Sequence, residues 1–182
     1  AGQLVEDLLL VAAGEDRFRP YMVGDPSRPR HDVHGLTDNL DWSTLYLWEN
    51  GAPVDEVVAR CPVTFETIRS LDLPFITTRA PSILFSRLRP GARIPPHTGM
   101  LNTRLICHLP LIVPAGCGFR VGGETRSWRE GELLIFDDTV EHEAWNDGSS
   151  DRIILIFDIW RPELNPEERC AVTAMFEAID AY

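Results

Sequence analysis

The chain has 182 residues and carries 17 basic residues, all of them arginine, against 28 Asp and Glu, which gives a formal charge of −11 at pH 7. This acidic balance excludes a nucleic-acid partner, because phosphate recognition needs a basic surface. A content of 44% apolar and 25% charged residues excludes a disordered or low-complexity chain, and the length predicts one domain over residues 1–182.

No apolar run reaches the ~18 residues that a membrane span needs, and the N-terminus shows no signal-peptide pattern. We therefore predict a cytoplasmic protein without a membrane partner. The cysteines are widely spaced, form no C-x-x-C pair and are typical of reduced thiols, although their even number still allows one disulfide.

Three helical patches lie outside the centre of the chain. Residues 4–13 are apolar with an acidic pair and predict a short amphipathic helix. The chain is then irregular from Gly14 to about Leu40, where three prolines break any long element. From Val54 to Leu71, apolar residues recur at steps of three and four. Asn165, followed by Pro166 and two glutamates, is typical of a capped helix start and predicts a final helix to about Ala178.

Between about residues 81 and 160, short β-rich runs alternate with tight turns such as Gly122-Gly123 and Asp147-Gly148. Several short strands joined in this way predict a sandwich or barrel. Because the helical patches flank this block, a parallel α/β fold is disfavoured. We predict a mainly β protein, a double-stranded β-helix (jelly roll) with a core at about 81–160 and flanking N- and C-terminal helices.

Two histidines follow strand-like runs, His97 in IPPHTG and His142 in FDDTVEHEAWN. If both point into a β-barrel, they form a candidate pair for iron, copper, zinc or nickel. A single histidine is more often a surface or hydrogen-bonded core residue, so these positions alone leave both interpretations open.

In the run TRLICHLPL, strand alternation places Arg104, Ile106 and His108 on one face and apolar residues on the other. A cation and an imidazole inside an otherwise buried strand are costly without an anionic partner. The pattern therefore indicates an inward face that binds an anion.

Arg152 begins a second such strand and shares a face with Ile154 and Ile156. An inward arginine is suited to a bidentate grip on a carboxylate ligand. Pairing with Asp137 or Asp138 within the chain is an equally good interpretation of this spacing.

Taken together, residues 41–164 resemble the aspartyl/asparaginyl β-hydroxylase family of 2-oxoglutarate-dependent oxygenases. The matching segments, in order and with matching spacing, are DWSTLYLWENG, SRLRPGARIPPHTG, NTRLICHLPL, WREGELLIFDD, EHEAWND and RIILIFDIWRPEL. The resemblance implies a catalytic domain that uses Fe(II), 2-oxoglutarate and O2, and that releases succinate and CO2.

The resemblance makes His97 and His142 the catalytic iron ligands. The residues that it assigns to the 2-oxoglutarate pocket are Trp42, Ser86, His108 and Arg152. Within this set the serine and the arginine would hold the C5 carboxylate, the histidine would lie near the C1 carboxylate, and the tryptophan would line the pocket.

The usual non-haem iron site adds a carboxylate two residues after the first histidine, a position that is Gly99 here. Glu141 and Glu143 flank His142, but neighbouring strand residues point to the opposite side. We therefore predict a metal centre held by His97 and His142 only.

The substrate prediction depends on charges that are missing. Leu84 and Ile106 stand where animal members of the family carry cations, which leaves Arg104 as the cation for a substrate carboxylate. The expected reaction is hydroxylation of the β-carbon of an Asp/Asn-like amino acid, free or in a peptide.

Two other classes of function stay open at this point. A jelly-roll binding or sensor protein would keep the fold without turnover, and Gly99 is compatible with that interpretation. A cupin-like zinc or manganese enzyme of another reaction class would need further inward ligands.

Overall fold

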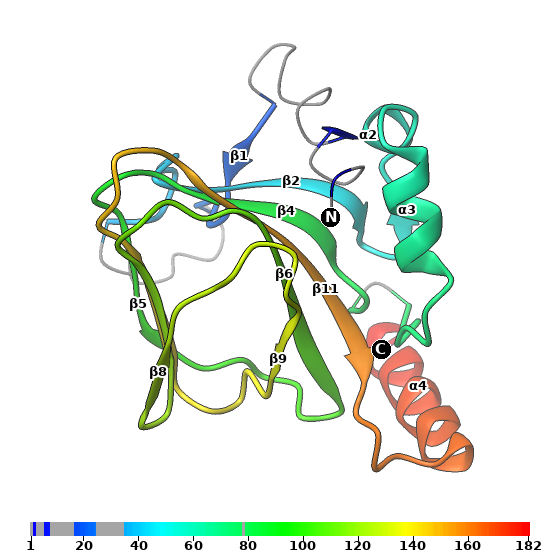
Figure 1. Cartoon of the computed structure of the whole chain (residues 1–182). Helices are drawn as coiled ribbons and strands as arrows, with labels where there is room; N and C mark the ends of the chain where they lie inside the picture. Colours follow the sequence, from blue (N-terminus) through cyan, green and yellow to red (C-terminus); the bar gives the residue numbers. More distant parts are fainter. Residues whose placement is uncertain (1, 3–5, 8–16, 25–34, 78) are drawn as a thin grey trace.

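The computed structural model describes residues 2, 6–7, 17–24, 35–77 and 79–182, and its centre is two antiparallel sheets that face each other (Figure 1). The larger sheet has the order β1-β2-β4-β11-β6-β9, with β3 paired to β2, and the smaller sheet has the order β5-β10-β7-β8. The strands of the larger sheet are β1 (Arg19–Pro20), β2 (Trp42–Glu49), β3 (Ala52–Pro53), β4 (Ile83–Leu88), β6 (Arg104–Ile112), β9 (Leu134–Phe136) and β11 (Arg152–Trp160). Those of the smaller sheet are β5 (Arg93–His97), β7 (Cys117–Val121), β8 (Glu124–Arg126) and β10 (His142–Asn146).

The last eight strands pair in a nested way. β4 pairs with β11, β5 with β10, β6 with β9, and β7 with β8. A long hairpin wound so that its strands alternate between two sheets gives this order, which is that of a double-stranded β-helix. The predicted fold class is confirmed, and all eight strands fall within or next to the predicted core.

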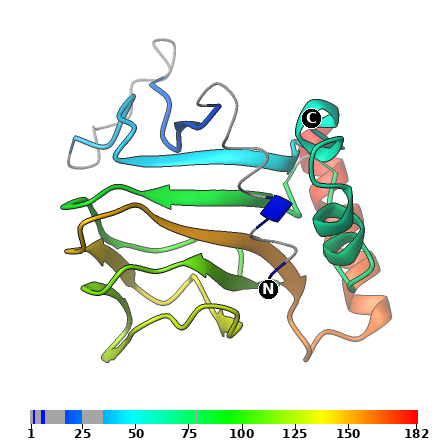
Figure 2. The same ribbon diagram turned by 45° about the horizontal axis from the view of Figure 1, so that its top comes forward.

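The sequence analysis missed β2, which extends the larger sheet beside β4 (Figure 2). Five of its eight residues are buried and the other three are half-buried, since both faces of the strand are covered. A strand covered on both faces shows little polar and apolar alternation, and this weakens its sequence signal.

The outer face of the larger sheet is covered by helices. The patch from Val54 to Leu71 forms two helices, α2 (Asp55–Val58) and α3 (Pro62–Arg69), because Pro62 opens a new helix. Their buried apolar residues share one apolar cluster with the outward side chains of the sheet. The helix predicted at 4–13 lies mostly outside the described residues. One residue of this segment that the structure describes, Asp7, accepts a hydrogen bond from Thr64 Oγ1 at 2.6 Å.

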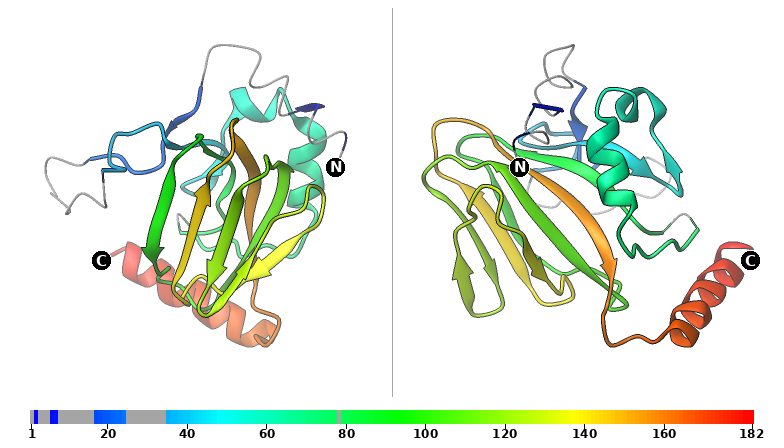
Figure 3. Two further views of the ribbon diagram at one scale, coloured as in Figure 1. Left: turned by 60° about the vertical axis from the view of Figure 1, so that its left-hand side comes forward. Right: turned by 45° about the vertical axis from the view of Figure 1, so that its right-hand side comes forward.

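The final helix, α4 (Pro166–Asp180), lies beyond the end of β11 (Figure 3). The predicted cap is confirmed, because Glu168 N donates to Asn165 Oδ1 at 3.0 Å and Asn165 N donates to Glu168 Oε2 at 2.9 Å. Across the part of the chain that the structure describes, no helix is long and apolar enough to cross a membrane. The four cysteines carry free thiols.

Candidate active site

A cavity of about 1220 Å³ opens between the two sheets. Its wall includes every site residue that the sequence analysis singled out, namely Trp42, Ser86, His97, Arg104, His108, His142 and Arg152. Leu84 and Ile106, the apolar residues at the two positions without a cation, also line it. The winding of the strands therefore gathers residues that are far apart in the sequence.

The two histidines face each other across neighbouring strands of the smaller sheet. His97 ends β5, His142 begins β10, the two residues are direct partners in the register, and their ring centroids are 4.1 Å apart. Each Nδ1 lies within hydrogen-bond distance of a carbonyl oxygen two residues earlier, Pro95 O at 2.8 Å and Val140 O at 2.9 Å. A carbonyl only accepts, so each Nδ1 carries the proton and each Nε2 keeps a lone pair for a metal ion.

Burial favours a neutral ring at His142. Burial lowers the pKa of His142 below its ordinary value, and the neighbouring His97 lowers it further. A metal ligand has to be neutral imidazole, so this environment suits metal binding.

The space beside Gly99 is filled by an acid from another part of the chain. Gly99 N donates to the backbone oxygen of Asp138 at 2.6 Å, and a Cβ at Gly99 would lie 2.1 Å from Asp138 Oδ2. The carboxylates of Glu141 and Glu143 both pair with Arg120. Within the described ranges, no group of three or more His, Cys, Asp or Glu side chains is placed to hold a metal ion.

We expect Gly99→Ala to displace the Asp138 carboxylate. Asp138 is only 7% exposed, and its Oδ2 is 3.2 Å from Arg104 Nη2, so its movement breaks a buried ion pair. The free energy of unfolding should fall by roughly 1–3 kcal/mol, as measured by urea denaturation. Gly123→Ala is the matched control, since a Cβ there has nothing within 4 Å, and a loss of equal size in both variants would contradict the expectation.

Arg152 is a buried cation at the deep end of the cavity. It is 1% exposed, its Cζ lies 5.0 Å from the Trp128 ring centroid, and burial lowers its pKa to about 10. The alternative pairing with Asp137 or Asp138 is wrong, because those carboxylates pair with other arginines. No carboxylate of the described residues lies within ion-pair distance of Arg152, an arrangement that favours binding of an anion.

Ser86 sits beside this arginine and faces two donors. Its Oγ accepts from Trp42 Nε1 at 3.3 Å and from Arg152 Nη2 at 3.5 Å. Both partners can only donate, so the hydroxyl proton of Ser86 is left for another acceptor. Trp42 is held in turn by Tyr21, whose ring stacks on it at 3.9 Å and which the sequence analysis missed in a segment interpreted as irregular.

His108 lies between this end and the histidine pair. It is 7% exposed and surrounded by the rings of Phe119, Trp128 and Phe136. Burial first, and then the charge of Arg152, lower the pKa of His108 well below its usual range. The residue is therefore a neutral imidazole, and its Nδ1 has no hydrogen-bond partner in the described part of the chain.

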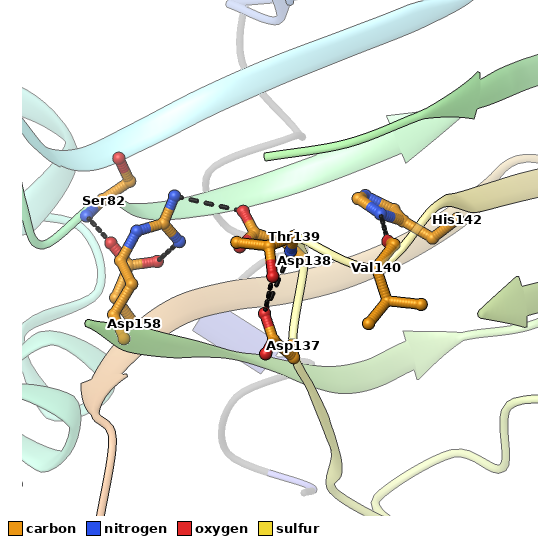
Figure 4. Close-up of polar contacts among 8 residues, drawn as sticks. Ser82, Asp137, Asp138, Thr139, Val140, His142 and Asp158 are labelled. Atoms are coloured by element: carbon orange, nitrogen blue, oxygen red, sulfur yellow. Dashed lines mark hydrogen bonds and ion pairs between the residues drawn. The ribbon is translucent and has the colours of Figure 1, made fainter. Parts of the chain in front are cut away.

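Arg104 lines the cavity as predicted, but its charge is engaged. Its Nη1 donates to Asp158 Oδ1 at 3.0 Å and its Nη2 to Asp138 Oδ2 at 3.2 Å, and Figure 4 labels the two carboxylates. Asp158 Oδ2 also accepts from Ser82 N at 3.0 Å. The sequence analysis did not foresee these two ion pairs, and a role of Arg104 in substrate binding stays a prediction.

Comparison with known proteins gives consistent results. The chain is 41% identical over 142 residues to human "Aspartyl/asparaginyl beta-hydroxylase", which covers 77% of this chain and 18% of that protein. It is 35% identical over 138 residues to "Ornithine lipid ester-linked acyl 2-hydroxylase" of Rhizobium tropici, which covers 74% of this chain and 47% of the relative. The chain thus spans less than half the length of these relatives.

Among solved structures, a cupin 2 conserved barrel domain protein from Salinispora arenicola is similar with a TM-score of 0.44 and 11% identity, over 85% of this chain and 92% of that one. The family profile described as "Aspartyl/Asparaginyl beta-hydroxylase" matches residues 16–162, which include the whole cavity wall from Tyr21 to Asp158. The chain therefore belongs to the aspartyl/asparaginyl β-hydroxylase family.

Proposed function

We propose that the protein is an Fe(II)- and 2-oxoglutarate-dependent hydroxylase that inserts one oxygen atom into an unactivated C–H bond and releases succinate and CO2. One observation carries the proposal. A buried arginine, Arg152, without a carboxylate partner in the described residues shares one cavity with a histidine pair whose Nε2 atoms are available. A metal ion and a dianionic cosubstrate would satisfy both features.

The donor set fits iron. Two imidazoles suit Fe(II), and with only His97 and His142 bound to the ion, positions stay open for the cosubstrate and O2. When bound, Fe(II) with 2-oxoglutarate and O2 supplies the oxidising power for hydroxylation of carbon, and the protein supplies geometry, charge pairing and exclusion of water.

The residues of the cavity divide the work on 2-oxoglutarate. Arg152 and the free hydroxyl proton of Ser86 would bind its C5 carboxylate by charge-assisted hydrogen bonds. Neutral His108 would lie near the C1 carboxylate, and Trp42 would hold Ser86 in place while forming part of the wall. Among the described residues, each of these donors has an uncharged hydrogen-bond acceptor or none.

We propose an Asp/Asn-like amino acid, free or in a peptide, as the substrate. Leu84 and Ile106 offer no charge, so we assign the substrate carboxylate to Arg104, where it has to compete with Asp138 and Asp158. This limits the substrate to one anionic group near the reacting carbon.

A lipid acyl chain is a second candidate substrate. The apolar side chains of Leu84, Ile106, Ile154 and Ile156 line the cavity. Such a wall suits an aliphatic chain, and the name of the Rhizobium tropici relative describes hydroxylation of an acyl group.

The proposal is tested by incubating the protein with Fe(II), 2-oxoglutarate, ascorbate and a panel of amino acids, peptides and acyl lipids. Mass spectrometry should show a gain of one oxygen atom in at least one candidate, and His97→Ala should abolish it. Binding of 2-oxoglutarate without succinate release would instead support a sensor protein.

A further inference from the structure

We infer that Arg161 is a positioning residue for the histidine pair, an inference that rests on the proposed metal site. Arg161 directly follows β11 and is not part of the cavity wall. One guanidinium there joins the loop that follows His97 to the turn that precedes His142.

The first side of this bridge is the loop of residues 98–103 between β5 and β6. Arg161 Nε donates to Asn102 O at 2.7 Å, and Arg161 N donates to Thr103 O at 3.1 Å. His97 is the residue immediately before this loop. Arg161 therefore holds the end of the loop that begins after His97, where the chain enters β6.

The second side is the turn between β9 and β10, which Figure 4 shows from Asp137 to His142. Arg161 Nη2 pairs with Asp137 Oδ2. The other oxygen of Asp137, Oδ1, accepts from Thr139 N at 3.0 Å and from Thr139 Oγ1 at 2.7 Å. The turn ends on Val140, whose carbonyl oxygen orients the ring of His142. Arg161 thus acts on His142 through Asp137.

A second connection between the same two segments is the backbone hydrogen bond from Gly99 N to Asp138 O at 2.6 Å. It fixes the distance between the segments, whereas Arg161 also fixes the orientation of the Asp137 carboxylate. The Arg161 and Asp137 side chains are 26% and 28% exposed, and a partly exposed ion pair contributes little to stability. Loss of Arg161 should therefore weaken the positioning of the two imidazoles while changing the free energy of unfolding only slightly.

The test is titration of the full chain with Co(II), monitored by the visible absorption of the bound ion, and a second titration with Mn(II). Urea denaturation of each variant measures stability in parallel. Partners that orient a metal ligand are worth about 10–100-fold in metal affinity. We expect Arg161→Ala to weaken Co(II) and Mn(II) binding about tenfold and to change the Co(II) spectrum, with a small change in the denaturation midpoint.

Arg93→Ala is the matched control. Arg93 begins β5, the strand that His97 ends, and its Nη2 donates to Asp147 Oδ1 at 2.8 Å. Asp147 directly follows β10, so this ion pair joins the same two strands at the ends away from the histidines. Its removal should leave the metal affinity and the spectrum unchanged. Equal metal affinity in Arg161→Ala and Arg93→Ala would overturn the inference.

A double-variant cycle checks the route through Asp137. Asp137→Asn keeps an Oδ1 acceptor for Thr139 but removes the charge that Arg161 binds, and it also provides the readout if Arg161→Ala does not fold. The combined variant should bind Co(II) no more weakly than Arg161→Ala alone, because both changes remove one interaction. Additive losses would overturn the route. A wild-type protein without metal affinity would refute the proposed function itself, whereas wild-type binding with an unaffected Arg161→Ala would refute only this inference.

Discussion

Replacement of His142 by alanine is expected to abolish Fe(II)-dependent succinate release. The change removes one of two imidazoles whose Nε2 atoms share the cavity, so one ligand remains and the ion loses its fixed geometry. Removal of a residue that only orients a metal ligand lowers metal affinity about 10–100-fold, and the loss here should be larger. Metal titration and a succinate assay measure both effects, and circular dichroism shows that the sheets persist.

Glu141→Gln is the control for this variant. Glu141 directly precedes His142, and its carboxylate pairs with Arg120 on the outside of the sheet at 3.0 Å. Its replacement should leave turnover intact. Wild-type succinate release by His142→Ala would show that the histidine pair is not the metal site.

Replacement of Arg152 by methionine is expected to remove 2-oxoglutarate binding selectively. A desolvated charge pair with the C5 carboxylate is worth about 2–4 kcal/mol, so affinity should fall by more than tenfold. The free energy of unfolding without ligand should stay the same or rise, because the change removes a buried cation that has no carboxylate partner among the described residues. Calorimetric titration and urea denaturation measure the two quantities.

These two measurements separate ligand binding from folding. If Arg152 had a structural role only, its replacement would lower stability and leave 2-oxoglutarate affinity unchanged. The exposed Arg126, which pairs with Glu124, offers Arg126→Met as a control that should change neither.

The positions of the predicted site residues follow from local features of the sequence. Alternation along β6 places Arg104, Ile106 and His108 toward the cavity, and alternation along β11 does the same for Arg152. Turn residues and the capped start at Asn165 gave the strand-rich centre and the last helix. In each case the signal lies within about ten neighbouring residues.

The features that the sequence did not predict depend on contacts between distant segments. Arg104 is 34 residues from Asp138 and 54 from Asp158, so nothing local indicates that its charge is engaged. The stack of Tyr21 on Trp42 and the carboxylate beside Gly99 are of the same kind. Only the winding of the strands brings these partners together.

The central claim is tested most directly by measuring succinate formed from 2-oxoglutarate in the presence of Fe(II) and O2, with and without a chelator, for the wild-type protein and His97→Ala. The proposed function predicts succinate release by the wild type that requires both Fe(II) and O2 and that is lost in His97→Ala. Absence of Fe(II)-dependent succinate across the whole panel of candidate substrates, or equal release by His97→Ala, would contradict it.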